Sequence, residues 1–489
     1  MKKSKIFFVA PAVYPFARDG RVAEFAAGLP AQLQSMGHEV RVLMPKYSLI
    51  NERKHIIRDI IRMKDIPVKM YNGDLPVSVK SGFIPETKTQ IYFAEQEKYY
   101  KRSDLYRDKR TGEYYKDNDE RFILLARTAI ETLKTLGWQP DIVHCIDWQS
   151  GLLPAMIREE QKQNNFFKKT IITFSVINTE EPALFDKSVF DKAFGQAHII
   201  EKEKCFHKSK FSFLKTAIMH SDAVTIPMTH KHLKTITKPA NDVEAILASA
   251  KMVQESYFGG EHNYWSPVNN NTLYKSYSAE KLERKVTNRE GFLDDKRTGF
   301  DPAHPIFGIL VEDLASQNKA LSQFLKAVKD VKLQLFILAN DSISSVSSLK
   351  PLITKNPNHT FFTMQDPEEQ FRHNFFAVAD MLYIPPSDDF AEIYFMNGIR
   401  YGGIPVIREE CIISDRFTPT KEKSTSGNAI IYSDEKDMVK KIAAAVSYYE
   451  TDKNGWDHLV RHAMKSDANW ALSASSMIKL YEKALAKLK

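Results

Sequence analysis

One stretch near the start of the chain, residues 5–47, most constrains what this protein can fold into. An apolar run at Ile6–Val9 predicts a strand buried on both faces, and a proline-containing loop follows it. Apolar residues then recur at helical spacing over 21–36, and 40–43 predicts a second strand. The pattern indicates a β-loop-α-β unit whose loop opens onto a helix N-terminus, where free N–H groups attract anions.

The same alternation returns in the second half of the chain. Strands are predicted at 306–311, 333–339, 360–363, 381–384 and 404–407, and helices at 320–328, 344–352, 367–379 and 392–401. Strands that alternate with helices imply a parallel sheet. We therefore expect two α/β domains, with ligands at the carboxyl ends of their strands and in the cleft between them.

Length and composition bound the class of protein. A chain of 489 residues exceeds one hydrophobic core, and a net charge of +8 suits an anionic ligand without indicating nucleic acid. The three cysteines are too few and scattered for a disulfide framework or a metal site, which favours a reducing cytoplasm. No apolar run is long enough to predict a membrane span. No metal or cofactor is expected, and the oligomeric state stays open.

The opening stretch carries a set of residues that resembles one enzyme family. Pro15, Phe16, Gly20, Pro30 and the run 37–47 fit the start of bacterial glycogen synthases and plant starch synthases. These enzymes transfer glucose from ADP-glucose to a growing α-1,4-glucan. Pro30 is a specific match because proline inside a helix is costly.

Further motifs extend the resemblance over nearly the whole chain. Matching groups lie at 117–129, at 140–149 with Asp147, at 277–289 and at 467–481. The resemblance implies the GT-B architecture, in which two Rossmann-like domains face a cleft and a C-terminal helix crosses back to the first. We expect an acceptor-side domain at 1–245, a nucleotide-sugar domain at 246–469 and the returning helix at 470–489.

The resemblance also assigns candidate site residues. Asp147 and Asp389 occupy the positions of cleft carboxylates and are the candidate catalytic residues; Glu392 replaces Asp389 if the loop alignment shifts. The candidate substrate-binding residues are Arg18, Gly20, Asn178 and Lys319. Two of these carboxylates have a structural alternative: Asp147 can bond backbone amides at a strand end, and Asp389 can cap a helix.

The departures from the family pattern fall on the residues that would hold ADP-glucose. Ile177 replaces a histidine that faces the donor glucose, and the family's diphosphate-binding arginine corresponds to Glu312 or Asp313. The adjoining lysine position is Asn318, with Lys319 next to it. Three glycine-bearing turns are also replaced. They correspond to Arg21 after the first strand, the segment 389–393, and the segment 410–413.

These substitutions define what the sequence predicts about function. We expect a glycogen/starch synthase-type glycosyltransferase whose ADP-glucose-dependent activity is weak or lost, with an α-glucan as acceptor. The alternatives are a non-catalytic protein that binds glucan or a partner and regulates glycogen metabolism, or a protein that takes a different anionic ligand through Arg18, Arg21 and Lys319.

Overall fold

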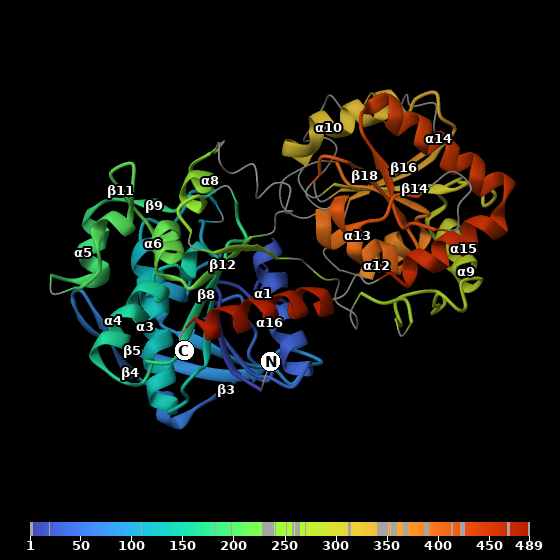
Figure 1. Ribbon diagram of the computed structural model, residues 1–489. Helices are drawn as coiled ribbons and strands as arrows, with labels where there is room; N and C mark the ends of the chain where they lie inside the picture. The colour runs from blue at the N-terminus through green and yellow to red at the C-terminus, as the bar shows by residue number, and fades with distance from the viewer. Residues whose placement is uncertain are drawn as a thin grey trace. The chain divides into compact units, whose positions relative to one another are not determined.

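The computed structural model divides the chain into two compact units. Unit 1 comprises Met1–Tyr257 and Trp470–Lys489, and unit 2 comprises Phe258–Asn469. The residues described are 3–18, 20–108, 110–179, 181–196, 198–226, 239, 241–250, 252–256, 259, 265–268, 270–311, 314–339, 351, 353, 359–364, 370–385, 391–411, 414–420, 426–466 and 470–487. Figure 1 shows helices packed around a sheet in each unit.

Unit 1 is built on a sheet that has ten strands within the described residues. Its main path is β13 (Val253–Glu255), β12 (Ala223–Ile226), β8 (Ile171–Ser175), β7 (Ile142–Ile146), β1 (Lys5–Val9), β2 (Glu39–Pro45), β6 (Gln90–Glu95), β5 (Gly73–Phe83) and β3 (Arg58–Asp59), and β4 (Ile66–Met70) pairs with β5. The strands from β13 to β6 are parallel, whereas β3, β4 and β5 are antiparallel. The parallel part confirms the expected α/β character.

Helices cover the sheet of unit 1. They are α1 (Gly20–Ser35), α2 (Glu97–Tyr100), α3 (Asn118–Leu136), α4 (Leu153–Gln163), α5 (Ser188–Phe194), α6 (Phe213–His220), α8 (Asp242–Leu247) and α16 (Trp470–Ala486). A small antiparallel sheet joins β10 (Phe206–His207), β11 (Lys210–Ser212) and β9 (Leu184–Phe185). The β1–α1–β2 unit forms as the apolar pattern predicts, because the four residues of Ile6–Val9 are buried.

Two parts of the unit 1 sheet were not predicted from the sequence. β4 and β5 form an antiparallel hairpin that extends the sheet beyond β6. At the other edge, β13 pairs in parallel with β12. Unit 1 therefore continues to Tyr257, beyond the expected boundary at 245. The three-residue sequence of β13 is too short to carry a strand signal.

The C-terminal helix α16 packs on α1 within unit 1, as the architecture predicts (Figure 1). Its Trp470 ring meets the ring of Phe25 edge-on, with the centroids 5.8 Å apart. Further along the helix, the Tyr481 hydroxyl lies 2.6 Å from Nδ1 of His144 on β7. The end of the chain is thus part of the first core.

Unit 2 carries a parallel sheet with six strands in the part that the structure describes. In spatial order these are β16 (His359–Met364), β15 (Gln334–Ala339), β14 (Ile306–Val311), β17 (Met381–Tyr383), β18 (Ile404–Arg408) and β19 (Ile430–Tyr432). The helices are α9 (Arg284–Lys296), α10 (Leu314–Ala327), α12 (Gln370–Val378), α13 (Ala391–Arg400), α14 (Glu435–Thr451) and α15 (Lys453–Met464). The helix predicted at 344–352 falls outside the described residues apart from position 351.

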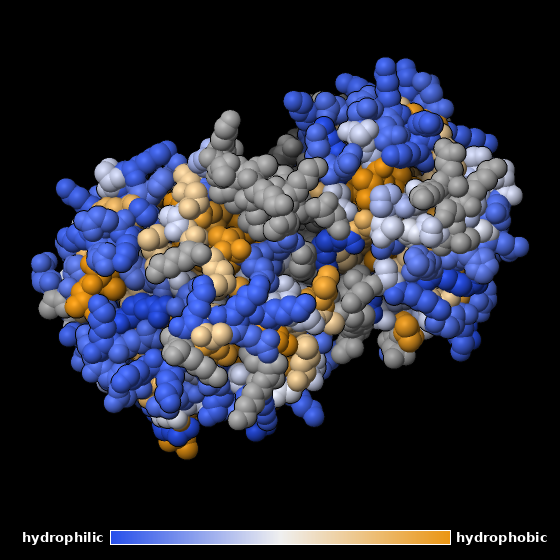
Figure 2. Space-filling view, viewed as in Figure 1, coloured by the Kyte–Doolittle hydropathy of each residue, from blue (hydrophilic) through white to orange (hydrophobic). Residues whose placement is uncertain are grey.

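The surface is mostly hydrophilic on the face that Figure 2 shows, with apolar residues in separate groups. Of the helices that the structure describes, none combines the length and the apolar character needed to span a membrane.

Candidate functional site

The carboxyl edge of the unit 1 sheet gathers four of the sequence-predicted site residues. β1, β7 and β8 are neighbours in parallel, so the loops that follow them leave the sheet at the same edge. Arg18 and Gly20 follow β1, Asp147 follows β7, and Asn178 follows β8. The topology therefore places these residues where α/β proteins bind ligands.

The loop after β1 leads into α1. The Tyr47 hydroxyl donates to the carbonyl oxygen of Pro11 at 2.9 Å, which holds the base of the loop against β2. Arg18 is exposed, and its guanidinium lies 5.7 Å from the centroid of the Tyr14 ring. Gly20 begins α1 with a φ of 46°, a conformation that favours glycine. Asp19 lies outside the described residues.

Asp147 is buried at the end of β7, and its carboxylate faces protein amides. Its Oδ1 accepts hydrogen bonds from the backbone N–H groups of Asn178 at 3.2 Å and Ile177 at 3.4 Å. Its own N–H donates to the carbonyl of Ser175 at 2.9 Å. The backbone has φ 57° and ψ 169°, a region in which residues other than glycine are strained. These contacts give Asp147 the role of a brace between β7 and the loop after β8.

An apolar, buried side chain occupies the position of the family's donor-facing histidine. Ile177 is 1% exposed, so its side chain belongs to the core of unit 1. Next to it, Asn178 is half-buried, and its Oδ1 accepts a hydrogen bond from the N–H of Glu181 at 3.2 Å. The structure thus brings Asp147 and Asn178 together, but it does so through a turn that their polar groups stabilise.

A charged and aromatic group that the sequence analysis did not identify lies beside this turn. The Glu181 carboxylate accepts a hydrogen bond from the Tyr114 hydroxyl and lies 3.5 Å from Nη2 of Arg107. The Arg107 guanidinium covers the Tyr114 ring at 3.7 Å. Because Arg107 and Tyr114 are far from Glu181 in sequence, no local pattern indicated this group.

In unit 2, one predicted site residue follows the carboxyl end of a strand within the described part of the chain. Lys319 is exposed in α10, the helix that follows β14. Gln317, two residues earlier in the same helix, is buried and donates from Nε2 to the carbonyl of Pro385 at 2.9 Å. Gln317 therefore ties the start of α10 to the segment after β17, whereas the Lys319 side chain is accessible to an anion.

Several positions singled out by the sequence lie outside the described residues. Asp389, Glu312 and Asp313 lie outside the described residues, as do Ile412 and Ile413 of the replaced third turn. Glu392 lies in α13, but its side chain is outside the described part. Their roles stay predictions.

The family-like motif at 277–289 serves the packing of unit 2. The Tyr277 hydroxyl and the Lys285 ammonium both donate to the carbonyl of Tyr401, at 2.7 and 2.8 Å. Nη1 of Arg289 pairs with the Asp380 carboxylate at 2.8 Å. Burial lowers the pKa of Lys285 to about 7. These contacts lie at the amino ends of β14 and β17, away from the edge expected to bind ligands.

Two of the described site residues can bind an anion. Arg18 and Lys319, each in its own unit, are exposed cations that can meet an anion. Among the residues that the structure describes, no group of three or more His, Cys, Asp or Glu side chains could hold a metal ion.

Comparisons with known proteins identify the domain and the fold. The starch synthase catalytic domain matches residues 5–248. Glycogen synthases from Chlorobaculum parvum and Chlorobium limicola are each 29% identical to the chain, over 492 and 489 aligned residues, and each alignment covers at least 98% of both proteins. The catalytic domain of starch synthase IV from Arabidopsis thaliana, bound to ADP and acarbose, matches with a TM-score of 0.83 at 19% identity, covering 99% of this chain and 100% of that one.

A more distant match gives the class. Sucrose-phosphate synthase from Thermosynechococcus elongatus has a TM-score of 0.55 at 12% identity, covering 99% of this chain and 100% of that one. Two parallel-sheet units with a returning C-terminal helix define the fold as that of the GT-B glycosyltransferases. Within that class, the domain match and the full-length relatives show that the chain belongs to the glycogen and starch synthase family.

Proposed function

We propose that this protein is a glycogen/starch synthase-type glycosyltransferase whose donor site no longer holds ADP-glucose as its relatives do, so that glucose transfer is weak or lost. One observation carries the proposal. At the carboxyl edge of unit 1, the position of the donor-facing histidine is the buried Ile177, and the Asp147 carboxylate is occupied by backbone amides. Neither group is available to the sugar of a nucleotide sugar.

The unit 2 sequence supports the same conclusion. The family's diphosphate-binding arginine corresponds to Glu312 or Asp313 here, which reverses the charge of that contact. Two unit charges about 4 Å apart interact by about 4 kcal/mol at an effective dielectric of 20. Reversal therefore costs several kcal/mol, which is roughly a thousandfold in affinity or more. Lys319 is close enough in sequence to offset part of this loss.

The ligand that we propose the protein retains is an α-glucan. The relatives are glycogen synthases, and the similar starch synthase IV was solved with acarbose as well as ADP. A protein that keeps the family framework and binds glucan, but transfers little glucose, would act as a non-catalytic regulator of glycogen metabolism. The second candidate is a different anionic ligand, favoured by the exposed Arg18 and Lys319.

Calorimetric titration of the full-length protein separates these proposals. We expect maltoheptaose to bind and ADP-glucose to bind at least about a thousandfold more weakly than it binds the Chlorobaculum parvum glycogen synthase used as a control. Incorporation of labelled glucose into glycogen at the rate of that control would refute the loss of activity. Binding of ADP-glucose without maltoheptaose would refute the regulatory role.

A restoration series tests why activity is lost. Ile177→His, Asn318→Lys and Glu312→Arg or Asp313→Arg together return the charged and polar groups of the family. We expect no recovery of transfer until the glycine-bearing turns are also returned, because a β-branched or charged residue blocks close backbone approach. Recovery by the side-chain changes alone would contradict this explanation.

A further inference from the structure

A cavity of about 430 Å³ opens in unit 1 at the edge opposite to the expected catalytic site. It lies at the amino ends of β8 and β12, because one of its lining residues, Asp222, directly precedes β12 and accepts a hydrogen bond from the N–H of Ile172 at 2.8 Å. A five-residue parallel strand is roughly 15 Å long, so the cavity is separated from the carboxyl edge by the length of the strands.

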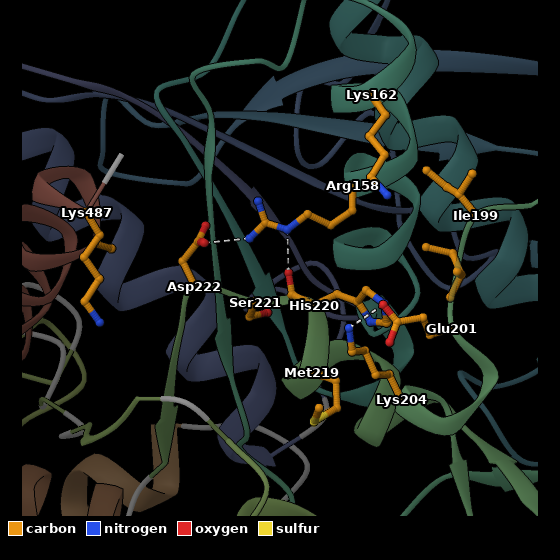
Figure 3. A pocket seen from close by; sticks show the side chains of 12 residues that line it. Arg158, Lys162, Ile199, Glu201, Lys204, Met219, His220, Ser221, Asp222 and Lys487 are labelled. Carbon is orange, nitrogen blue, oxygen red and sulfur yellow. Dashed lines mark hydrogen bonds and ion pairs between the residues drawn. The ribbon is translucent and has the colours of Figure 1, made fainter. Parts of the chain in front are cut away.

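Positive charge predominates in the lining of this cavity. Four cations line it, from α4, from the segment before β10 and from the residue that follows α16: Arg158, Lys162, Lys204 and Lys487. Two carboxylates line it, Glu201 and Asp222. Figure 3 shows the Arg158 guanidinium directed at Asp222, with the lysines placed around this pair.

The two carboxylates are each held by a cation. Nη2 of Arg158 lies 2.7 Å from Oδ1 of Asp222, and Nζ of Lys204 lies 2.7 Å from Oε1 of Glu201. Lys162 and Lys487 are exposed, and no ion pair is found for either among the described residues. The cavity therefore carries two positive charges beyond those that its own carboxylates balance.

The remaining groups favour a polar ligand with some apolar body. The Nδ1 atom of His220 lies 2.8 Å from the carbonyl of Thr216, which leaves Nε2 for another partner. Burial lowers the pKa of His220, so the imidazole is neutral near pH 7. Ile199, Ile200 and Met219 supply an apolar part of the lining.

The helix dipoles offer a structural reason for two of these cations. Lys162 lies in the last turn of α4, and Nε of Arg158 donates to the carbonyl of His220 at the end of α6 at 3.0 Å. Cations at helix C-termini offset the negative end of the helix dipole. That effect needs no cavity, however, and it does not bring the ends of three separate helices to one opening. An anion bound between these helix ends would also balance the excess positive charge.

From the cavity, its excess positive charge and its position, we infer that this is a second binding site, for a small phosphate compound with two or more negative charges. Lysine ammonium groups bind phosphate oxygens through charge-assisted hydrogen bonds. Because Lys487 and Ala484 line the site together with α4 and α6, the ligand would fasten the end of α16 to the rest of unit 1.

Two probes test the site on the full-length protein: inorganic pyrophosphate and ribose 5-phosphate. We expect either probe to bind by calorimetry, to bind more weakly as salt is raised, and to slow hydrogen exchange at the ends of α6 and α16. Stronger binding of ribose 5-phosphate would identify an organic phosphate as the ligand class, and stronger binding of pyrophosphate an inorganic one. Each of Lys162→Gln and Lys487→Gln should lower the affinity about tenfold.

Matched controls come from the same surface. Lys168 and Lys483 are exposed lysines near α4 and on α16 that do not line the cavity, so Lys168→Gln and Lys483→Gln should leave binding unchanged. Equal losses of affinity in all four variants would show that the probes are attracted by the overall positive charge of the surface, and would overturn the inference. Absence of binding would also overturn it, as would protection confined to the loop after β1 or to α10.

Discussion

At the scale of single residues, the burial of a polar group decides what it does. Asp147 occupies a position that the family motif marks as catalytic, yet its carboxylate accepts hydrogen bonds from the amides of Ile177 and Asn178. It does so from a backbone conformation with φ 57° that costs about 1–3 kcal/mol for a residue other than glycine. Those hydrogen bonds offset the strain.

Two substitutions of Asp147 separate the strain from the hydrogen bonds. We expect Asp147→Ala to lower the free energy of unfolding by about 2–4 kcal/mol, because both amides lose their acceptor and the strain remains. Asp147→Gly should be about 1 kcal/mol less damaging, since glycine adopts this conformation freely. Urea unfolding followed by circular dichroism measures both. Equal losses would show that the conformation is unstrained, and an unchanged stability would show that the carboxylate braces nothing.

At the scale of elements, the meeting of α1 and α16 depends on one glycine. A Cβ atom on Gly28 of α1 would overlap the indole ring of Trp470 on α16. The indole also packs edge-on against Phe25, one helical turn away. Glycine is a poor helix former, so its place inside α1 is explained by this close approach and not by local preference.

Substitution at Gly28 tests that explanation. Gly28→Ala should raise the helix preference of α1 by about 1 kcal/mol, but the overlap with Trp470 should cost about 1–3 kcal/mol, so α16 loosens. Faster hydrogen exchange in α16 is the expected result. In a Trp470→Ala background the same Gly28→Ala change should become stabilising, because the space is then open. The same effect in both backgrounds would contradict the proposed contact.

At the scale of the whole molecule, the two ends of the chain share one core. His144 on β7 is buried between Tyr481 of α16, 2.6 Å from Nδ1, and Ser175 of β8, 2.7 Å from Nε2. The ring also stacks on Phe8 with the centroids 4.7 Å apart. Burial lowers the pKa of His144 from 6.5 to about 3. Protonation of this one group therefore opposes the whole packing arrangement of unit 1.

The pH dependence of stability follows from that shift. Between pH 6.5 and about 3 the unfolded chain binds a proton at His144 that the folded protein does not, so stability falls as the pH is lowered. The slope from this residue reaches about 1.4 kcal/mol per pH unit. Burial also lowers the pKa of His38, His55 and His220, so they contribute with the same sign.

The variant His144→Gln isolates the contribution of this residue. Its free energy of unfolding should be lower than that of the wild type at pH 7, and the difference should shrink as the pH falls toward 4.5. Urea unfolding at a series of pH values measures it. Curves that stay parallel over this range would mean that the pKa of His144 is not lowered in the folded protein.

The sequence by itself determined the α/β alternation and the family framework. An apolar run is a local property of a segment, which is why the strand predicted at Ile306–Val311 has the same bounds in the structure. The family motifs added the returning helix α16, because a matched set of residues carries a fold with it. β13 was missed because three residues hold too little apolar pattern.

Only the tertiary structure decided which groups surround each matched residue. His144 and Tyr481 are 337 positions apart, and Lys285 meets a carbonyl 116 positions away, so no spacing in the sequence reveals either contact. A side chain's role depends on the groups around it in space. An aspartate that faces solvent is open to a ligand, whereas Asp147 is buried and accepts hydrogen bonds from two backbone amides.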